Sequence, residues 1–77
     1  MKEAVEMLVK ALVREPDAVE VQEIKRDGKT TIIEIRVADT DMGPLIGRQG
    51  RTIKALRAIF DAISQKHHHR FILEIAE

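Results

Sequence analysis

The segment Gly47-Arg48-Gln49-Gly50 has the residue types of an anion-binding turn, because two glycines flank two polar side chains. Glycine allows the backbone to turn tightly and leaves the neighbouring N–H groups uncovered. Arg48 and the nearby Arg51 place positive charge beside those groups. If a helix begins directly after Gly50, its free N–H groups and its dipole also favour a phosphate. The spacing therefore predicts a phosphate-binding loop.

The better-known nucleotide motifs do not fit this loop. A Walker loop ending at Gly50 requires glycine at position 45 and lysine at position 51, where this chain has Leu45 and Arg51. The glycines of the dinucleotide fingerprint are spaced differently and follow a strand, whereas a short helix is expected before Gly47. We therefore predict neither nucleotide hydrolysis nor a bound cofactor.

The charge of the chain is unevenly distributed, although its net value is zero. Residues 1–41 carry a net charge of −3, and residues 61–77 carry −1. Residues 42–60 carry +4 and contain no acidic side chain, their cations being Arg48, Arg51, Lys54 and Arg57. A local excess of this kind attracts a polyanion to one part of the surface.

The composition excludes several other classes of protein. Apolar residues make up 44% and charged residues 34% of the 77 residues, which is typical of a soluble globular chain. Cysteine is absent, so neither a disulfide nor a thiolate metal site can form. The apolar runs are far shorter than the roughly 18 residues that span a membrane, and no signal peptide is recognised. We expect one domain over residues 1–77 and a cytoplasmic protein.

The periodicity of apolar residues predicts six elements in the order α-β-β-α-α-β. They are expected at residues 3–14, 19–26, 30–38, 42–46, 51–65 and 70–76. A helical crossover makes the second and last strands parallel, whereas the Asp27-Gly28 hairpin makes the first two antiparallel. The predicted fold class is α+β, with a three-stranded mixed sheet covered on one face by helices.

Several local features follow from the same patterns. The core is expected to contain Val5, Leu8, Val9 and Leu12 of the first helix, Thr31, Ile33, Ile35 and Val37 of the second strand, Ile53, Leu56, Phe60 and Ile63 of the long helix, and Phe71, Leu73 and Ile75 of the last strand. Asp27-Gly28 predicts a type I′ turn, in which both central residues have positive φ. Asp39 and Asp41 are expected to cap the short helix rather than to form a catalytic pair.

The run from Gly43 to Arg57 includes Ile46-Gly47-Arg48-Gln49-Gly50-Arg51-Thr52-Ile53, which resembles the I-G-x-x-G-x-x-I core of KH domains. The element order is similar to that of type II KH domains, and the length to that of small stand-alone bacterial KH proteins. The resemblance implies binding of about four nucleotides of single-stranded RNA, clamped at residues 47–50. It also implies the site residues: Ile46 and Ile53 line an apolar groove, Arg48, Gln49 and Arg51 meet phosphates, and Lys54 and Arg57 extend the basic surface.

The resemblance further implies a cellular role and partners. Proteins of this kind act as RNA chaperones or post-transcriptional regulators, self-associate, and pair with a larger KH protein. A KH-shaped interaction domain without physiological RNA binding is the alternative. RRM and cold-shock modules read bases with exposed aromatic rings, whereas this chain has only Phe60 and Phe71, both on apolar faces.

No catalytic or metal-binding constellation is recognised. Ser64 is the only serine and lies near the end of a helix, which does not suit a Ser-His hydrolase. His67-His68-His69 would point to alternating faces of an extended segment, so the three rings do not readily converge on one metal ion. We expect a solvated loop there, which protonation would turn into an auxiliary basic patch. The chain is not predicted to be an enzyme.

The long helix carries more apolar surface than one sheet covers. Ile59, Ala55, Ala58 and Ala62 widen its apolar arc to about 220°, compared with the ~100° stripe of an ordinary surface helix. A second copy of the chain would cover this surplus in a homodimer. The alternative is that the first helix of the same chain covers it.

Overall fold

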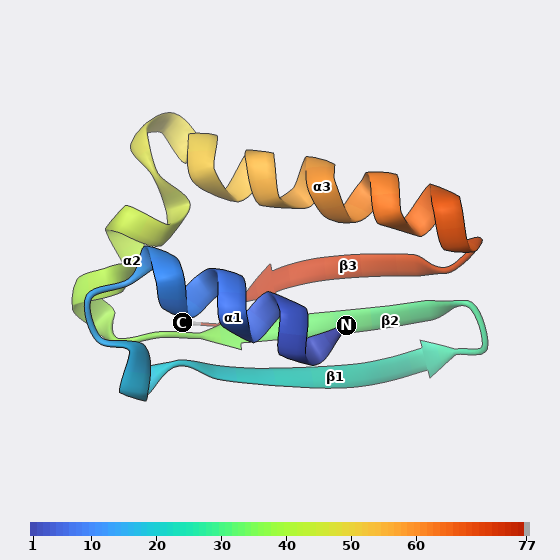
Figure 1. The fold of residues 1–77 in the computed structure, drawn as a ribbon, viewed down its shortest axis with the longest axis horizontal. Coiled ribbons are helices and arrows are strands. Elements are labelled where there is room, and N and C mark those ends of the chain that lie inside the picture. Colours follow the sequence, from blue (N-terminus) through green and yellow to red (C-terminus); the bar gives the residue numbers. More distant parts are fainter. Residues whose placement is uncertain (77) are drawn as a thin grey trace.

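The computed structural model describes residues 1–76 and confirms the predicted order of elements. The helices are α1 (Lys2–Leu12), α2 (Asp39–Ile46) and α3 (Arg51–His67), and the strands are β1 (Glu20–Asp27), β2 (Thr30–Arg36) and β3 (Arg70–Ile75) (Figure 1). A short 3₁₀ turn at Pro16–Ala18 follows α1, and a tight turn at Arg48–Gly50 follows α2. Strand β2 lies in the centre of the sheet, antiparallel to β1 and parallel to β3. The α+β class and the mixed sheet are therefore confirmed.

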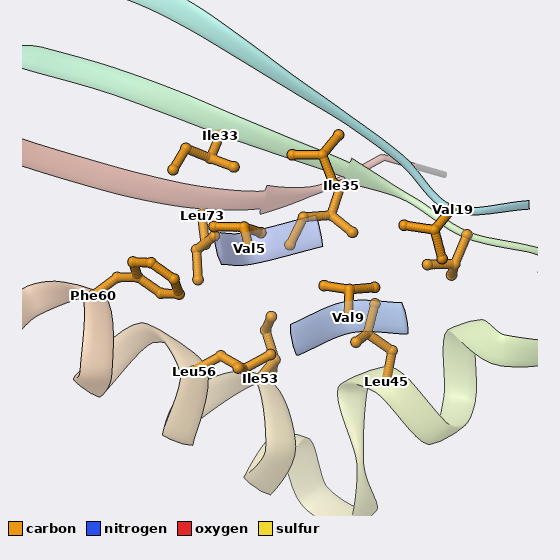
Figure 2. Close-up of a cluster of buried hydrophobic side chains, with 12 residues drawn as sticks. Val5, Val9, Val19, Ile33, Ile35, Leu45, Ile53, Leu56, Phe60 and Leu73 are labelled. Carbon is orange, nitrogen blue, oxygen red and sulfur yellow. The ribbon is translucent and has the colours of Figure 1, made fainter. Parts of the chain in front are cut away.

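The core lies between one face of the sheet and the three helices (Figure 2). On β2, Thr31, Ile33 and Ile35 are buried and the residues between them are not, as a period of two requires. The helices contribute Val5, Val9, Leu45, Ile53, Leu56 and Phe60 to this core. Leu73 is buried on β3, whereas Ile63, Phe71 and Ile75 pack against the core only partly buried.

Helix α1 buries a narrower stripe than its sequence predicts. Val5 and Val9 are each 1% exposed, but Leu8 and Leu12 are 40% and 46% exposed. The prediction that these two leucines belong to the core is therefore wrong. The apolar arc of α1 is wider than the part of the helix that faces the sheet, which is a single i, i+4 pair.

The turn between β1 and β2 differs from the predicted one. Gly28 and Lys29 form a two-residue loop, but neither Asp27 nor Gly28 has a positive φ, so the type I′ prediction is wrong. Instead, Asp27 Oδ1 accepts a hydrogen bond of 2.7 Å from the N–H of Lys29. This bond holds the turn through a side chain and keeps the pKa of Asp27 below its ordinary value.

Asp41 links α2 by hydrogen bonds to the segment that follows α1. Both Asp39 and Asp41 lie inside the first turn of α2, whose N-cap is Ala38, so the prediction that they cap this helix is wrong. Asp41 is 0% exposed, and its carboxylate oxygens accept hydrogen bonds from the N–H groups of Arg14 (2.9 Å) and Glu15 (3.0 Å). A buried carboxylate requires partners of this kind. The chain just after α1 is thereby tied to the helix that leads into the glycine loop.

Ser64 links the carboxyl end of α3 to β3 by hydrogen bonds. Its Oγ donates a hydrogen bond of 2.7 Å to the carbonyl of Phe60 and accepts one of 2.9 Å from the N–H of Phe71. The hydroxyl therefore hydrogen-bonds to the last turns of α3 and to the start of β3 at the same time. This structural role agrees with the prediction that Ser64 is not a nucleophile.

The histidine run behaves differently at its three positions. His67 and His68 are exposed, and His68, which directly follows α3, has a left-handed backbone (φ 54°). His69 is half-buried: its Nε2 lies 2.8 Å from Thr31 Oγ1, and its ring centroid lies 4.7 Å from that of Phe71. The expectation of a wholly solvated loop is therefore wrong for His69, because the ring contacts Thr31 and Phe71 where the chain turns back into β3.

Candidate nucleic-acid interface

The loop between α2 and α3 is built from left-handed backbone. Gly47 has φ 81° and ψ 168°, Gln49 has φ 56° and ψ 27°, and Gly50 has φ 74° and ψ 17°. Side chains disfavour all three conformations, and the first is accessible essentially to glycine alone. The two glycines predicted from the sequence therefore stand where the backbone needs them, whereas Gln49 adopts its conformation without that freedom.

Close packing adds a second reason for glycine at position 47. A Cβ on Gly47 would overlap the side chain of Thr52 and lie 2.7 Å from its backbone nitrogen. At Gly50 a Cβ would meet only ordinary contacts, the nearest being Lys54 Cε at 3.8 Å. Gly47 therefore allows the loop to fold back onto the first turn of α3.

Helix α2 leads into the loop through a glycine–proline pair. Pro44 lies inside α2, where it has no N–H to donate. The residue before proline normally avoids the helical region, because its Cβ meets the proline ring, and Gly43 has no Cβ. The helix then ends with a 2.8 Å hydrogen bond from the N–H of Gly47 to the carbonyl of Gly43.

The amino end of α3 is available to an anion. No side chain caps its first turn and no acidic residue lies there. The N–H of Arg51 is bonded to the carbonyl of Arg48, and the N–H groups that follow are the ones that a helix leaves free for a ligand. These N–H groups lie where the sequence predicts donors to a phosphate.

The predicted polar and basic residues lie in the loop and along the first two turns of α3. Arg48, Gln49, Arg51, Lys54 and Arg57 are all exposed. Arg51, Lys54 and Arg57 follow one another at intervals of three along the 17-residue helix α3, so they form one continuous basic edge. The structure therefore brings together all the cations that the sequence singled out.

The two predicted apolar groove residues occupy different environments. Ile46 is 38% exposed at the end of α2, next to the loop. Ile53 is 6% exposed and belongs to the hydrophobic core. Ile46 is therefore accessible to a bound molecule, whereas Ile53 mainly anchors the first turns of α3 beneath the loop.

A small hollow lies between α3 and β3, close to the basic edge. Its volume is about 130 Å³, and it is lined by Arg57, Phe60, Asp61, Arg70, Phe71, Ile72 and Leu73. Arg70 was not predicted to lie near Arg57, since the sequence separates them by the second half of α3. The parallel pairing of β2 with β3 brings the last strand back beside the helix.

Part of the apolar surface of α3 has no partner within the described chain. Ile59 is 49% exposed, and Ala55, Ala58 and Ala62 are exposed as well. The alternative that α1 covers this surplus is therefore wrong. On α1, Met7 is 73% exposed.

Neither metal chemistry nor a membrane span is indicated. Within residues 1–76, no three His, Asp or Glu side chains are grouped closely enough to hold a metal ion. In the same residues, no helix has the length and apolar character that crossing a membrane requires.

Comparisons with known proteins agree with this architecture. The family model described as "KhpA/KhpB, KH domain" matches residues 2–75. A protein of Caldanaerobacter subterraneus subsp. tengcongensis, named RNA-binding protein KhpA, is 48% identical over 97% of this chain and 99% of its own length. Proteins with the same name from Aquifex aeolicus and Halalkalibacterium halodurans are each 46% identical over 100% of this chain, covering 96% and 100% of their own lengths.

No solved structure gives a significant match. The relatives are named as RNA-binding proteins rather than as enzymes, which agrees with the prediction of a non-enzymatic chain. The matched residues include every element from α1 to β3 and the whole glycine loop. The chain belongs to the KhpA/KhpB family of KH domains.

Proposed function

We propose that this chain binds single-stranded RNA at the Gly47–Gly50 loop. The observation that carries the proposal is the uncapped amino end of α3, which two glycines with positive φ leave open between exposed arginines. A KH loop of this form clamps the backbone of about four nucleotides. The names of the relatives support RNA as the ligand.

Each site residue has a physical role in this proposal. Arg48, Gln49 and Arg51 contact phosphates beside the free N–H groups of α3. Lys54 and Arg57 extend the positive potential along the helix, toward the hollow at β3. Ile46 contacts a base, and Ile53 supports the loop from the core.

Most of the affinity should come from phosphate neutralisation, because a four-nucleotide footprint offers few base contacts. The logarithm of the binding constant should then fall with the logarithm of salt concentration, with a slope of roughly −1.5 to −3. Binding that does not change with salt would contradict the electrostatic part of the proposal. A preference for duplex RNA would contradict the KH mode of binding.

The decisive experiment replaces Arg48 and Gln49 by Asp. Both side chains are exposed, so the fold should survive, and the new charges repel a phosphate at the loop. The double variant Gln22→Asp/Arg26→Asp is the matched control, because it makes the same replacements at exposed positions of β1. We expect loss of RNA binding for the loop variant alone, with unchanged circular dichroism.

Unchanged affinity in the folded loop variant would favour the alternative, a KH-shaped interaction domain that binds no RNA in the cell. If the proposal holds, the protein acts in the cytoplasm as an RNA chaperone or a post-transcriptional regulator, with residues 1–77 as one KH domain. Crosslinking in cells, followed by sequencing of the bound RNA, would identify the transcripts concerned.

We also propose that the exposed apolar face of α3 forms a homodimer. Ile59 and its neighbouring alanines allow close approach of a second helix, and nothing in residues 1–76 covers them. Two linked RNA sites would raise avidity by roughly 10²-fold or more. The same face suits a larger KH protein of the KhpB type.

Light scattering tests the homodimer. A mass near 8.7 kDa at micromolar concentration would mean a monomer and contradict the proposal. If a dimer is found, Ala58→Arg should dissociate it without unfolding the chain, since Ala58 is exposed. Persistence of the dimer in that variant would move the interface away from α3.

A further inference from the structure

The face of the sheet opposite the helices carries a row of isoleucines. Ile24 of β1 pairs with Ile32 of β2, which in turn pairs with Ile72 of β3. Since Ile33 of β2 points into the core, alternation places this row on the other face, away from the helices seen in Figure 2. Ile24 is 44% exposed, and the other two are partly exposed. An apolar row therefore crosses the whole sheet on its uncovered face.

Opposite charges flank this row. Two residues further along the parallel pair, Glu34 of β2 lies beside Glu74 of β3. Two residues in the other direction, Thr30 lies beside Arg70. Within residues 1–76, neither Glu74 nor Arg70 has an ion-pair partner. In the β2–β3 pair, the residues next to the isoleucines on this face are thus acidic on one side and basic on the other.

We propose that this face binds the same face of a second copy of the chain, about a two-fold axis that runs along the isoleucine row. Such an axis keeps isoleucine opposite isoleucine. It also brings Glu74 of each copy opposite the partner's Arg70, so that the ion pair forms twice. A two-fold axis along β2 would instead bring Glu34 opposite the partner's Glu34, and like charges disfavour that arrangement. The charge pattern therefore selects one orientation.

The association should be weak. Three short strands present less surface than the roughly 800 Å² per partner of a standard interface, so we expect dissociation constants in the high micromolar range. The face is separate from the exposed side of α3 and from the glycine loop. The inference therefore depends neither on the α3 homodimer nor on RNA binding.

Sedimentation equilibrium tests this arrangement in the Ala58→Arg background, in which α3 cannot associate. We expect a monomer–dimer equilibrium there. Glu74→Arg or Arg70→Glu, added alone, places like charges opposite each other and should raise the dissociation constant about tenfold or more. The combination of both changes restores opposite charges and should restore the dimer. Ile24→Lys, at an exposed position of the edge strand, should also weaken it.

Two results would overturn the proposal. A monomer at every concentration would show that this face does not bind a second copy of the chain. Equal dissociation constants for the single and combined variants would show that Glu74 and Arg70 do not meet in the dimer. If Ala58→Arg prevents folding, Ile59→Arg at a second exposed position of α3 replaces it in the same series, and circular dichroism controls for the fold of each variant.

Discussion

The two ends of α3 solve the same geometric problem in different ways. At both ends the chain reverses through left-handed backbone, at Gly47, Gln49 and Gly50 before the helix and at His68 after it. At the carboxyl end, side-chain hydrogen bonds of Ser64 and His69 close the turn. At the amino end no side chain caps the helix.

This difference separates an end that is structural from an end that is available for binding. At the carboxyl end, the polar side chains of Ser64 and His69 are hydrogen-bonded within the chain, so they hold the turn and are not available to a ligand. The amino end relies on glycine and on backbone contacts, and within residues 1–76 no side chain caps the N–H groups that follow Arg51. Perturbing each end in turn therefore tests the comparison.

The largest effect is expected at Gly47. In Gly47→Ala the new Cβ overlaps Thr52 in a backbone conformation that alanine avoids, and the free energy of unfolding should fall by about 2 kcal/mol or more. Gly28→Ala is the control, because its Cβ meets nothing within 4 Å and Gly28 has no positive φ. Urea denaturation should show a change of at most about 0.5 kcal/mol for the control. Equal stability of the two variants would mean that the loop can change its conformation freely.

A smaller loss is expected at the other end, in Ser64→Ala. This change leaves the Phe71 N–H without its partner in a partly buried site, and it should cost about 1–2 kcal/mol of unfolding free energy. Thr40→Ala also removes a hydroxyl, but that hydroxyl bonds Glu15 in an exposed position and should contribute little. Urea denaturation of both variants tests the contrast. Unchanged RNA binding in Ser64→Ala would support the assignment of this end as structural.

Glycine substitutions at Gln49 and His68, the two other residues with left-handed backbone, should sharpen the comparison. Gln49→Gly and His68→Gly each relieve backbone strain, so each should raise the free energy of unfolding by up to about 1 kcal/mol. Under the proposed function, only Gln49→Gly should also weaken RNA binding. Equal RNA affinity of these two variants would contradict a phosphate contact by Gln49.

The smallest effect concerns the β1–β2 turn and depends on pH. The Lys29 N–H stabilises the ionised form of Asp27, so the folded pKa lies below the ordinary value of 3.8. The stabilisation is therefore complete above pH 3.8 and is lost as pH falls through the lower folded value. An NMR titration of the Asp27 carboxyl should have its midpoint below 3.8, and Asp27→Asn should remove the corresponding change in stability. A midpoint at or above 3.8 would contradict this hydrogen bond.

The sequence predicted the features that depend on local pattern. The alternation from Thr31 to Val37 identified β2, because a strand buried on one face repeats every two residues. The glycines at 47 and 50 identified the loop, because their conformations exclude most side chains. The basic edge could also be read from the sequence, since all its cations lie within one helix and its entry.

The features that were mispredicted depend on contacts between distant segments. Asp41 looks like a helix cap, but its carboxylate binds N–H groups 26 and 27 residues earlier. His69 looks solvated in the sequence, but its ring is hydrogen-bonded to Thr31, which lies 38 residues earlier. The apolar periodicity of α1 includes Leu8 and Leu12, but it does not state how much of that face the sheet can cover.

The parallel pairing of β2 with β3 has a consequence for the speed of folding. Thr30 pairs with Arg70, so the β2–β3 pair forms only after two segments forty residues apart in the sequence have met. Strands β1 and β2, in contrast, are joined by a two-residue turn. The entropy of closing the larger loop must be lost before its contacts contribute. We therefore expect Leu73→Ala mainly to accelerate unfolding, and Val21→Ala also to slow folding, in stopped-flow measurements. The reverse pattern would contradict this order of events. On this view, the segment that carries the glycine loop acquires its geometry late, when β3 docks and fixes the direction of α3.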